Sequence, residues 1–281
     1  MTYQRAWAEI NLAHLTHNLA SIRKMTQETR LMGIIKADAY GHGAVPVARS
    51  LLGGGVTSFG VAICEEGIEL RENGVNVPIL IMGFTPTPLL GEVVCRDLTQ
   101  TVFSLDGARV LAAQAACENK RAVVHIKIDT GMSRLGFLPN QESIEAICEI
   151  AAIPNLLVEG IYTHCATSDA LDNSFVFKQQ ARFQWVLGEL STRGLDIPMK
   201  HMANSGAVAQ TLLGVEGRGV YFDMVRPGIL LYGYPPSGEM ISTCASIGLK
   251  PIMRLMTQVS MIKHLPAGVG ISYGHLYHYA A

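Results

Sequence analysis

The sequence predicts an α/β fold in which a parallel sheet closes into a (β/α)8, or TIM, barrel. Short apolar runs alternate with longer stretches whose apolar residues recur at helical spacing. The runs are apolar throughout, which is typical of parallel strands buried on both faces by helices. About eight such units in roughly 230 residues agree with the size of a barrel. An open doubly wound sheet is the alternative, but no G-x-G-x-x-G motif follows the first run.

The elements can be assigned in chain order. Asn11 is suited to cap a first helix, because Leu12, Leu15, Leu19 and Ile22 follow it at helical spacing. The expected strands are Met32–Ile35, Phe59–Ile63, Pro78–Met82, Thr101–Phe103, Val123–Ile128, Leu157–Tyr162, Met199–Ala203 and Met224–Tyr232. The expected helices between them are 43–53, 64–73, 106–118, 141–152, 174–193 and 204–213.

The pattern changes after the last run. Residues 233–238, Gly-Tyr-Pro-Pro-Ser-Gly, resemble a linker, and strand-like segments follow at Leu255–Lys263 and Ile271–Tyr277. We therefore expect a barrel domain at 1–238 and the beginning of an all-β domain at 239–281, with residues 1–10 able to pair with the β domain. Since about 40 residues hardly form an independent β domain, this part is expected to depend on further chain or on a partner.

Composition narrows the class of protein. The chain has 281 residues, 49% of them hydrophobic, and a net charge of −1 without a basic stripe, so a small-molecule ligand is expected rather than nucleic acid. No apolar stretch has the length of a signal or a membrane span, so we expect a cytoplasmic protein that does not bind a membrane. The six cysteines occur singly, which predicts reduced core thiols and no metal site.

Lys36 is the first candidate for chemistry. It ends the first expected strand and begins the segment Lys-Ala-Asp-Ala-Tyr-Gly-His-Gly at 36–43. A lysine that is partly desolvated at a strand end has a lowered pKa and a nucleophilic amine. Such an amine can form a Schiff base with a carbonyl, such as the aldehyde of pyridoxal phosphate. Taken alone, Lys36 is better explained as a lysine that reaches from a strand end to solvent.

Polar residues also follow four other expected strands, and in a barrel such residues gather at one end. They are Lys127, Asp129, Arg134, His164, His201, Asn204, Ser205 and Arg226. Each has a structural alternative, such as a hydrogen-bonded core histidine or a helix cap. Free backbone N–H groups at 204–206 and near Gly228 and Ile229 are also suited to bind an anion.

Two segments together identify a family. Lys-Ala-Asp-Ala-Tyr-Gly-His-Gly at 36–43 and Asp-Thr-Gly-Met-Ser-Arg-Leu-Gly-Phe at 129–137 resemble the bacterial, PLP-dependent alanine racemases, which combine a barrel with a β domain. The resemblance extends from Trp7 to His275. It implies a two-base interconversion of L-alanine and D-alanine that supplies D-alanine for peptidoglycan, with pyridoxal 5'-phosphate as cofactor.

The resemblance also implies roles for individual residues. Lys36 would carry the cofactor and act as one base, and Tyr273 would be the second base, reaching the other subunit of a head-to-tail homodimer. Arg226 would face the pyridine nitrogen, Arg134 would contact the substrate carboxylate, and Lys127 would be a carbamylated lysine that orients Arg134. The other cofactor-binding residues would be Tyr40, His164, Asn204, Ser205, Gly228 and Ile229.

Members of this family continue past the point that corresponds to Ala281, and that later segment contributes to the partner's site. Two functions from different classes therefore stay open. Tyr273 favours a racemase, because a protein that only binds the cofactor has no need of a second base. The absence of the later segment favours a truncated, inactive PLP-binding barrel. A racemase of another small amino acid, such as serine, would use the same residues.

Overall fold

The computed structural model describes residues 5–213 and 218–280. The chain forms two compact units, one of residues 10–252 and the other of residues 1–9 together with 253–281. Within the described residues, no helix is both long enough and apolar enough to cross a membrane.

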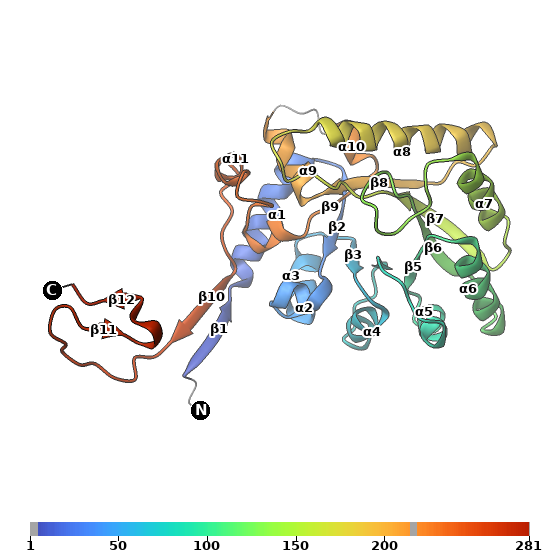
Figure 1. Cartoon of the computed structure of the whole chain (residues 1–281). Helices are drawn as coiled ribbons and strands as arrows, with labels where there is room; N and C mark the ends of the chain where they lie inside the picture. Colours follow the sequence, from blue (N-terminus) through green and yellow to red (C-terminus); the bar gives the residue numbers. More distant parts are fainter. Residues whose placement is uncertain (1–4, 214–217, 281) are drawn as a thin grey trace. The chain divides into compact units, whose positions relative to one another are not determined.

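The larger unit is a closed barrel of eight parallel strands, which confirms the predicted fold class (Figure 1). Each strand pairs with the next along the chain, and the last pairs with the first. The strands are β2 (Arg30–Ile34), β3 (Ser58–Val61), β4 (Ile79–Ile81), β5 (Thr99–Val102), β6 (Ala122–Lys127), β7 (Leu156–Tyr162), β8 (Met199–Asn204) and β9 (Met224–Arg226).

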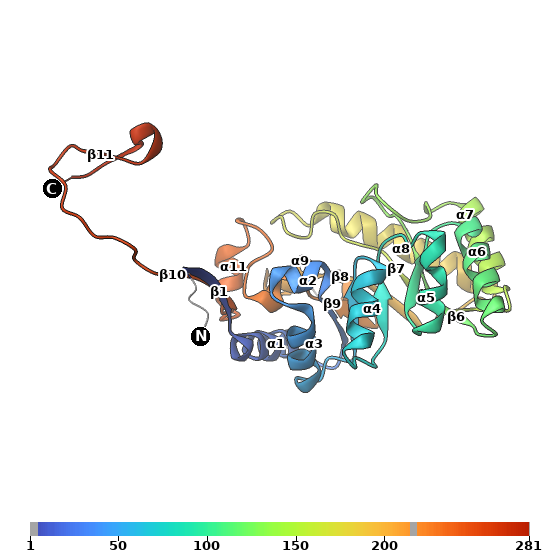
Figure 2. The same cartoon turned by 90° about the horizontal axis from the view of Figure 1, so that it is seen from below.

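Helices connect the strands and lie outside them, as the two perpendicular views show (Figures 1 and 2). Asn11 caps the first helix as predicted, because its side chain accepts a hydrogen bond from the His14 backbone N–H. The helices of this unit are α1 (Leu12–Thr26), α2 (Lys36–Gly41), α3 (Ala44–Gly53), α4 (Cys64–Glu72), α5 (Leu90–Cys95), α6 (Leu105–Cys117), α7 (Gln141–Ala151), α8 (Ser174–Thr192), α9 (Ser205–Gln210), α10 (Arg218–Tyr221) and α11 (Ile241–Ala245).

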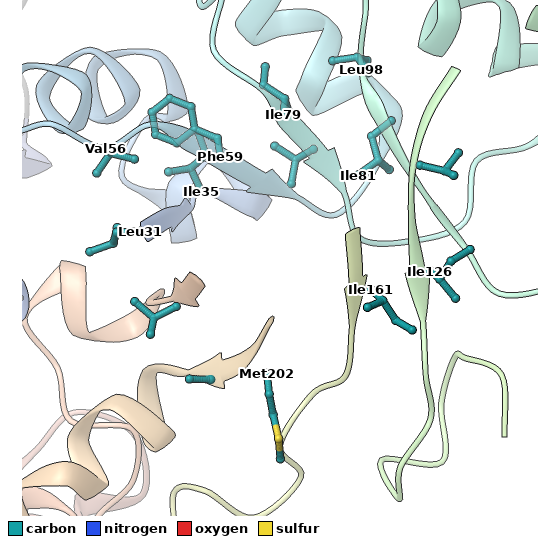
Figure 3. Packing of buried hydrophobic residues seen from close by; sticks show 14 of the residues in the cluster. Leu31, Ile35, Val56, Phe59, Ile79, Ile81, Leu98, Ile126, Ile161 and Met202 are labelled. Atoms are coloured by element: carbon teal, nitrogen blue, oxygen red, sulfur yellow. The ribbon is translucent and has the colours of Figure 1, made fainter. Parts of the chain in front are cut away.

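Alternate strand residues serve two different layers. Phe59, Ile79, Ile81 and Ile126 belong to the large apolar cluster that includes the buried faces of the helices (Figure 3). The residues between them face the barrel interior, where Met32, Ile34, Leu80, Tyr162 and Met224 form a small second cluster. This alternation is the ordinary consequence of the two-residue period of a strand.

The barrel interior also contains polar groups on three of its strands. His125 and Lys127 on β6, His201 on β8 and Arg226 on β9 are all at most 5% exposed. Buried polar and charged groups cost free energy unless they are hydrogen-bonded. Their number inside this barrel indicates that its interior is built for more than packing.

The last predicted strand was too long. β9 ends at Arg226, and Ile229–Tyr232 forms the 3-10 helix η3. Pro227 explains the end of the strand, because proline has no N–H to donate to a sheet. The short helices α2, α5, α10 and α11 were not predicted, since so few residues carry little periodicity. Cys95 and Cys117 are exposed, which corrects their assignment to the core, although all six cysteines are free thiols.

Residues 239–252 pack on the barrel in this structure, so the boundary between the units falls after Ile252 and not at the expected 238. Met240 and Ile252 are fully buried. Asn18 on α1 is buried too, and its amide donates to the carbonyls of Leu231 and Lys250 and accepts from the Lys250 N–H. The segment is thus tied to the barrel by apolar and polar contacts.

The smaller unit contains short strands. β1 (Ala6–Ile10) pairs with β10 (Met253–Thr257). β11 (Gly270–Ile271) pairs antiparallel with β12 (Tyr277–His278), with the 3-10 helix η4 (Tyr273–His275) between them. The expected strand at Ile271–Tyr277 is therefore two short strands joined by a helical turn. The proposal that the chain's first residues pair with the β segment remains compatible with this arrangement.

Replacing Asn18 should destabilise the barrel unit. In Asn18→Ala, the Lys250 N–H and two carbonyls lose their buried partner, so we expect the free energy of unfolding to fall by about 2–3 kcal/mol. Asn73→Ala is the control, because Asn73 is exposed and its side-chain amide donates only to the Glu69 carbonyl among the described residues, and its effect should stay within about 0.5 kcal/mol. Urea denaturation measures both variants, and equal losses would contradict this account of the 239–252 segment.

Candidate active site

Lys36 lies at the carboxyl end of β2 in an unusual backbone segment. Ala37, Asp38, Ala39 and Tyr40 have φ values from 51° to 56°, so they form a left-handed helical turn without glycine. Each such residue costs roughly 1–2 kcal/mol. The turn places Lys36 and Tyr40 on the wall of one cavity. Strain of this kind persists where the surroundings hold it, and it clusters at functional sites.

Two carboxylates hold the turn. Glu66 Oε1 accepts from the Ala37 N–H at 2.6 Å, and Glu66 Oε2 accepts from the Ala62 N–H at 2.7 Å. Asp38 Oδ1 accepts from the Ala44 N–H, the first residue of α3, at 2.6 Å. These charge-assisted bonds supply partners for backbone donors that a regular helix would pair internally.

A cavity of about 270 Å³ opens among the carboxyl ends of the strands. The structure brings eight of the predicted site residues together on its wall. They are Lys36, Tyr40, His164, Asn204, Ser205, Arg226, Gly228 and Ile229. The barrel explains the convergence, because these residues end or follow four of its strands, β2, β7, β8 and β9, at the same end of the barrel.

One side of this cavity is formed by small residues and hydroxyl groups. Ser205 Oγ accepts from the Gly228 N–H at 2.8 Å and from the Leu230 N–H at 3.4 Å. The Tyr40 hydroxyl lies so near Gly228 that a Cβ there would overlap it. Asn204 caps α9, since its Oδ1 accepts from the Ala207 N–H, so the helix-cap alternative is correct as well. Hydroxyl and amide donors of this kind suit an anion.

Arg226 is at the centre of the polar interior and only 2% exposed. Its Nη1 donates to His201 Nδ1 at 2.7 Å, and its Nη2 donates to the carbonyls of Thr163 at 2.8 Å and Met202 at 3.0 Å. Burial lowers the pKa of Arg226 to about 10, so the guanidinium remains charged at neutral pH. The buried Nε has no hydrogen-bond partner among the described residues. Arg226 lines the cavity, and its side chain has one donor without a partner among the described residues.

Two aromatic rings accompany Arg226. His164 Nδ1 is 3.4 Å from Arg226 Nη2, and burial together with the Arg226 charge holds the pKa of His164 well below its ordinary value. The imidazole is therefore neutral at neutral pH. The Tyr162 ring stacks on His201 with 4.7 Å between centroids, and its face lies 5.2 Å from Arg226 Cζ and 4.8 Å from Lys127 Nζ. Aromatic faces stabilise nearby cations.

A second cavity, of about 230 Å³, shares Lys36 and His164 with the first and adds Lys127 and Arg134. Asp129 shapes the loop that presents Arg134, because its carboxylate accepts from the backbone N–H groups of Gly131, Ser133 and Arg134 at 3.0 Å each. Burial alone would raise the pKa of Asp129, but these N–H donors hold it below its usual value. Burial and the charge of Arg226 lower the pKa of Lys127 to about 7.

Tyr273 is the predicted site residue that the structure does not place with the others. It belongs to the smaller unit, and its side chain is 98% exposed. Sequence reasoning also missed residues that support the site, namely Glu66 and Tyr162. Glu66 lies three residues after Ile63, a position typical of a capping residue at a helix start, and this was the available signal.

Residues 10–236 match the family model described as alanine racemase, N-terminal domain. The alanine racemase of Desulforamulus reducens is 43% identical over 272 residues, which are 96% of this chain and 71% of that protein. Alanine racemase 1 of Clostridium acetobutylicum is 40% identical over 268 residues, 95% of this chain and 67% of that protein.

Solved structures agree. An alanine racemase structure from Clostridium difficile 630 matches with a TM-score of 0.91 and 38% identity over 100% of this chain and 72% of that chain. A histidine racemase from Leuconostoc mesenteroides matches with a TM-score of 0.85 and 28% identity, over 99% and 72%. The chain spans about two thirds to three quarters of the length of these proteins.

Lys127 gives the site a pH signature. Its folded pKa of about 7 lies below the unfolded value, so the folded state has to hold a buried cation below about pH 7. Burial of this cation lowers the free energy of unfolding by at most about 5 kcal/mol. Between about pH 7 and pH 10 only the unfolded chain binds the proton, so this loss of stability disappears as the pH rises. In CO2-free buffer, Lys127→Met should therefore be more stable than the parent near pH 6, and this advantage should shrink towards pH 10.

Unfolding midpoints in urea across this pH range measure the difference. Lys120→Met is the matched control, because Lys120 pairs with Asp97 at the surface, and its difference from the parent should change much less with pH. A difference for Lys127→Met that is constant from about pH 6 to about pH 10 would contradict the lowered pKa.

Proposed function

Because the chain belongs to the alanine racemase family, we propose that it interconverts L-alanine and D-alanine with pyridoxal 5'-phosphate as cofactor. The observation that carries the proposal is the unused Nε donor of Arg226 in a cavity wall that also contains Lys36. We place the reaction in the cytoplasm, where its product would serve peptidoglycan synthesis.

The residues present fit this cofactor at three points. The Lys36 amine can bind its aldehyde carbon, and Tyr40, Ser205 and the backbone at Gly228 and Ile229 line the side suited to a phosphate. Arg226 Nε, a donor that lacks a partner, suits a ring nitrogen that accepts. Asn204 and His164 also line this cavity, and the neutral imidazole adds no charge beside the ring.

Arg226 would limit how strongly the ring of the bound cofactor withdraws electrons. When bound, the cofactor withdraws electrons and makes the α C–H of an amino acid acidic enough to ionise. Arginine does not give up its proton in practice, so its Nε–H keeps the ring nitrogen as an acceptor without protonating it. Electron withdrawal is then limited, which should favour return of a proton to the α carbon over transamination.

Inversion at the α carbon needs a base on each face, one to take the proton and one to return it. We assign Lys36 Nζ to one face and the Tyr273 hydroxyl to the other. Because the Tyr273 side chain is exposed, its hydroxyl is accessible to the site of a second copy of the chain, in a homodimer with shared sites. Leu276 and Tyr277 beside it are 94% and 63% exposed, and exposed apolar groups of this kind are typical of surfaces that a partner covers.

Arg134 and Lys127 would serve the substrate. The guanidinium of Arg134 can bind a carboxylate with two hydrogen bonds. Lys127, with its pKa of about 7, has a partly neutral amine at neutral pH that can react with CO2, and a carbamate formed there would give an anion that orients Arg134. The amine adds to CO2 and releases one proton. With 13C-labelled bicarbonate, the parent should show a carbamate carbon resonance that Lys127→Met lacks.

Borohydride treatment tests the cofactor assignment. The protein loaded with pyridoxal phosphate should absorb visible light, and reduction should leave the cofactor covalently attached to the peptide that contains Lys36. Lys36→Ala should lose both signals, whereas the surface variant Lys120→Ala should retain both. Recovery of the label on a different lysine of the parent would refute the assignment. Racemisation of L-alanine, with L-serine in a parallel assay, tests the substrate.

Mixed chains test the two bases. Lys36→Ala and Tyr273→Phe homodimers should each be nearly inactive in racemisation. A heterodimer of the two should recover activity, because one of its two sites then contains both Lys36 and Tyr273. The two chains carry different affinity tags so that the heterodimer can be isolated. An isolated heterodimer as inactive as its parents would show that both bases act within one chain.

A further inference from the structure

A chain of hydrogen bonds crosses the barrel interior from Arg226 to the opposite end. Arg226 Nη1 is 2.7 Å from His201 Nδ1, His201 Nε2 is 2.9 Å from His125 Nδ1, and His125 Nε2 is 3.2 Å from Glu159 Oε2. The two imidazoles are 0% and 2% exposed, whereas the Glu159 side chain is 38% exposed. Glu159 thus connects the amino-terminal end of the barrel with the cation at the carboxyl end.

The N–H groups in this chain of hydrogen bonds can all donate in only one direction, from Arg226 towards Glu159. Arg226 is a donor without acceptor capacity, so His201 Nδ1 has to accept, and its proton is on Nε2. That proton makes His125 Nδ1 the acceptor in turn, and the His125 proton lies on Nε2. The Glu159 carboxylate, which only accepts, matches it. The cation at one end and the anion at the other end impose the same tautomer on both histidines.

The local backbone is adapted to this chain. In the pairing of β6 with β7, Val124 lies opposite Val158, but His125 lies opposite Gly160, so Glu159 is an extra residue in a β-bulge. Bulges redirect side chains and are frequent near active sites. Gly160 leaves room for the imidazole, because a Cβ there would lie 2.6–2.7 Å from three atoms of the His125 ring. The bulge thus allows Glu159 to reach His125, and the glycine leaves space for the His125 ring.

A folding role does not account for these groups. An apolar barrel interior of the same volume would pack without the cost of burying imidazoles and a cation. The chain of hydrogen bonds does, however, fix the position of Arg226 Nη1. With Nη1 and Nη2 both held, the plane of the Arg226 guanidinium is set, and so is the direction of its free Nε.

We propose that His125 and Glu159 are positioning residues that act through His201 to orient Arg226 towards the cofactor ring. The proposal rests on the proposed function, because the ring is what Arg226 Nε would meet. Neither residue lines the two cavities described above. Both line a separate cavity of about 320 Å³ at the amino-terminal end of the barrel, which gives Glu159 access to water.

The charges around the chain favour this arrangement. The hydrogen bond from His125 lowers the pKa of Glu159 against the opposing effect of burial, and the charge of Arg30 also lowers it, so the carboxylate is ionised at neutral pH. Burial and the charge of the neighbouring Arg226 hold the pKa of His201 well below its ordinary value. His201 is therefore neutral and transmits orientation, not charge.

Nuclear magnetic resonance of the protein without cofactor tests the direction of the chain. With 15N-labelled histidine, His125 and His201 should both show the neutral Nε2–H tautomer, and with 15N-labelled arginine the Arg226 guanidinium should give separate Nη signals. Glu159→Gln should keep both features, because its carbonyl oxygen can still accept from His125. Glu159→Leu should mix the tautomers and merge the Arg226 signals. An Nδ1–H tautomer at His125 in the parent would overturn the proposal.

The second measurement is the ratio of transamination to racemisation in the loaded enzyme. Glu159→Leu should raise this ratio by up to about tenfold, as expected for the loss of an outer hydrogen-bond partner, and Glu159→Gln should restore most of the parent ratio. Thr57→Val is the matched control, because Thr57 lines the same cavity outside the chain of hydrogen bonds. An unchanged ratio in a folded, racemising Glu159→Leu enzyme would overturn the positioning role.

The two measurements separate this proposal from the proposed function. If the protein neither bound the cofactor nor racemised alanine, the proposed function would fail, and the Arg226 and histidine signals would still decide whether Glu159 orients the guanidinium. If racemisation were present but those signals did not respond to Glu159→Leu, the function would stand and the positioning role would be overturned.

Discussion

The site depends on one constraint, the burial of the Arg226 guanidinium inside a barrel. A cation that is 2% exposed has to find hydrogen-bond acceptors within the protein, and backbone carbonyls supply two of them. One is Met202, which lies where the register between β8 and β9 shifts, between His201 and Asn204. The irregular pairing leaves this carbonyl available to a side chain. The ends of β7, β8 and β9 are thus shaped around a single cation.

The backbone turn that begins at Lys36, which lines the same cavity, also depends on a few polar side chains. The left-handed turn after β2 is unfavourable for four residues without glycine, and Glu66 and Asp38 offset part of that cost with short hydrogen bonds. The turn also brings Tyr40 against Gly228, which joins the first and last strands of the barrel at the site. Both halves of the cavity therefore consist of backbone that deviates from regular geometry and is held by polar side chains.

The sequence predicted the barrel well because its strands are buried on both faces and therefore appear as continuous apolar runs. It failed at Met224–Tyr232, where an apolar run continues through Pro227 into a 3-10 helix. The strand-end rule found five of the residues that line the cavity, since that rule depends only on where each strand ends; they are Lys36, His164, Asn204, Ser205 and Arg226. Those same residues were given roles through the family resemblance, and the roles remain proposals.

Other parts of the site had no signal in the sequence. The left-handed turn has no glycine among its four strained residues to indicate it. His125 and Glu159 lie 34 positions apart, and they meet only because a bulge shifts the pairing of β6 and β7. Such contacts depend on register, which apolar patterns do not determine to one residue. Tyr273 is a different case, because the role proposed for it requires a second copy of the chain.

The proposed roles divide the reaction between two parts of the molecule. The unit of residues 10–252 contains every candidate for holding the cofactor, together with Lys36. Lys36 alone serves one face of the α carbon, so it can remove and return a proton there, which exchanges the α hydrogen with solvent but retains the configuration. Inversion needs the Tyr273 hydroxyl on the other face. Under the proposed roles, cofactor binding and one-sided proton exchange would belong to the barrel, whereas racemisation would require the barrel of one chain and the β segment of another.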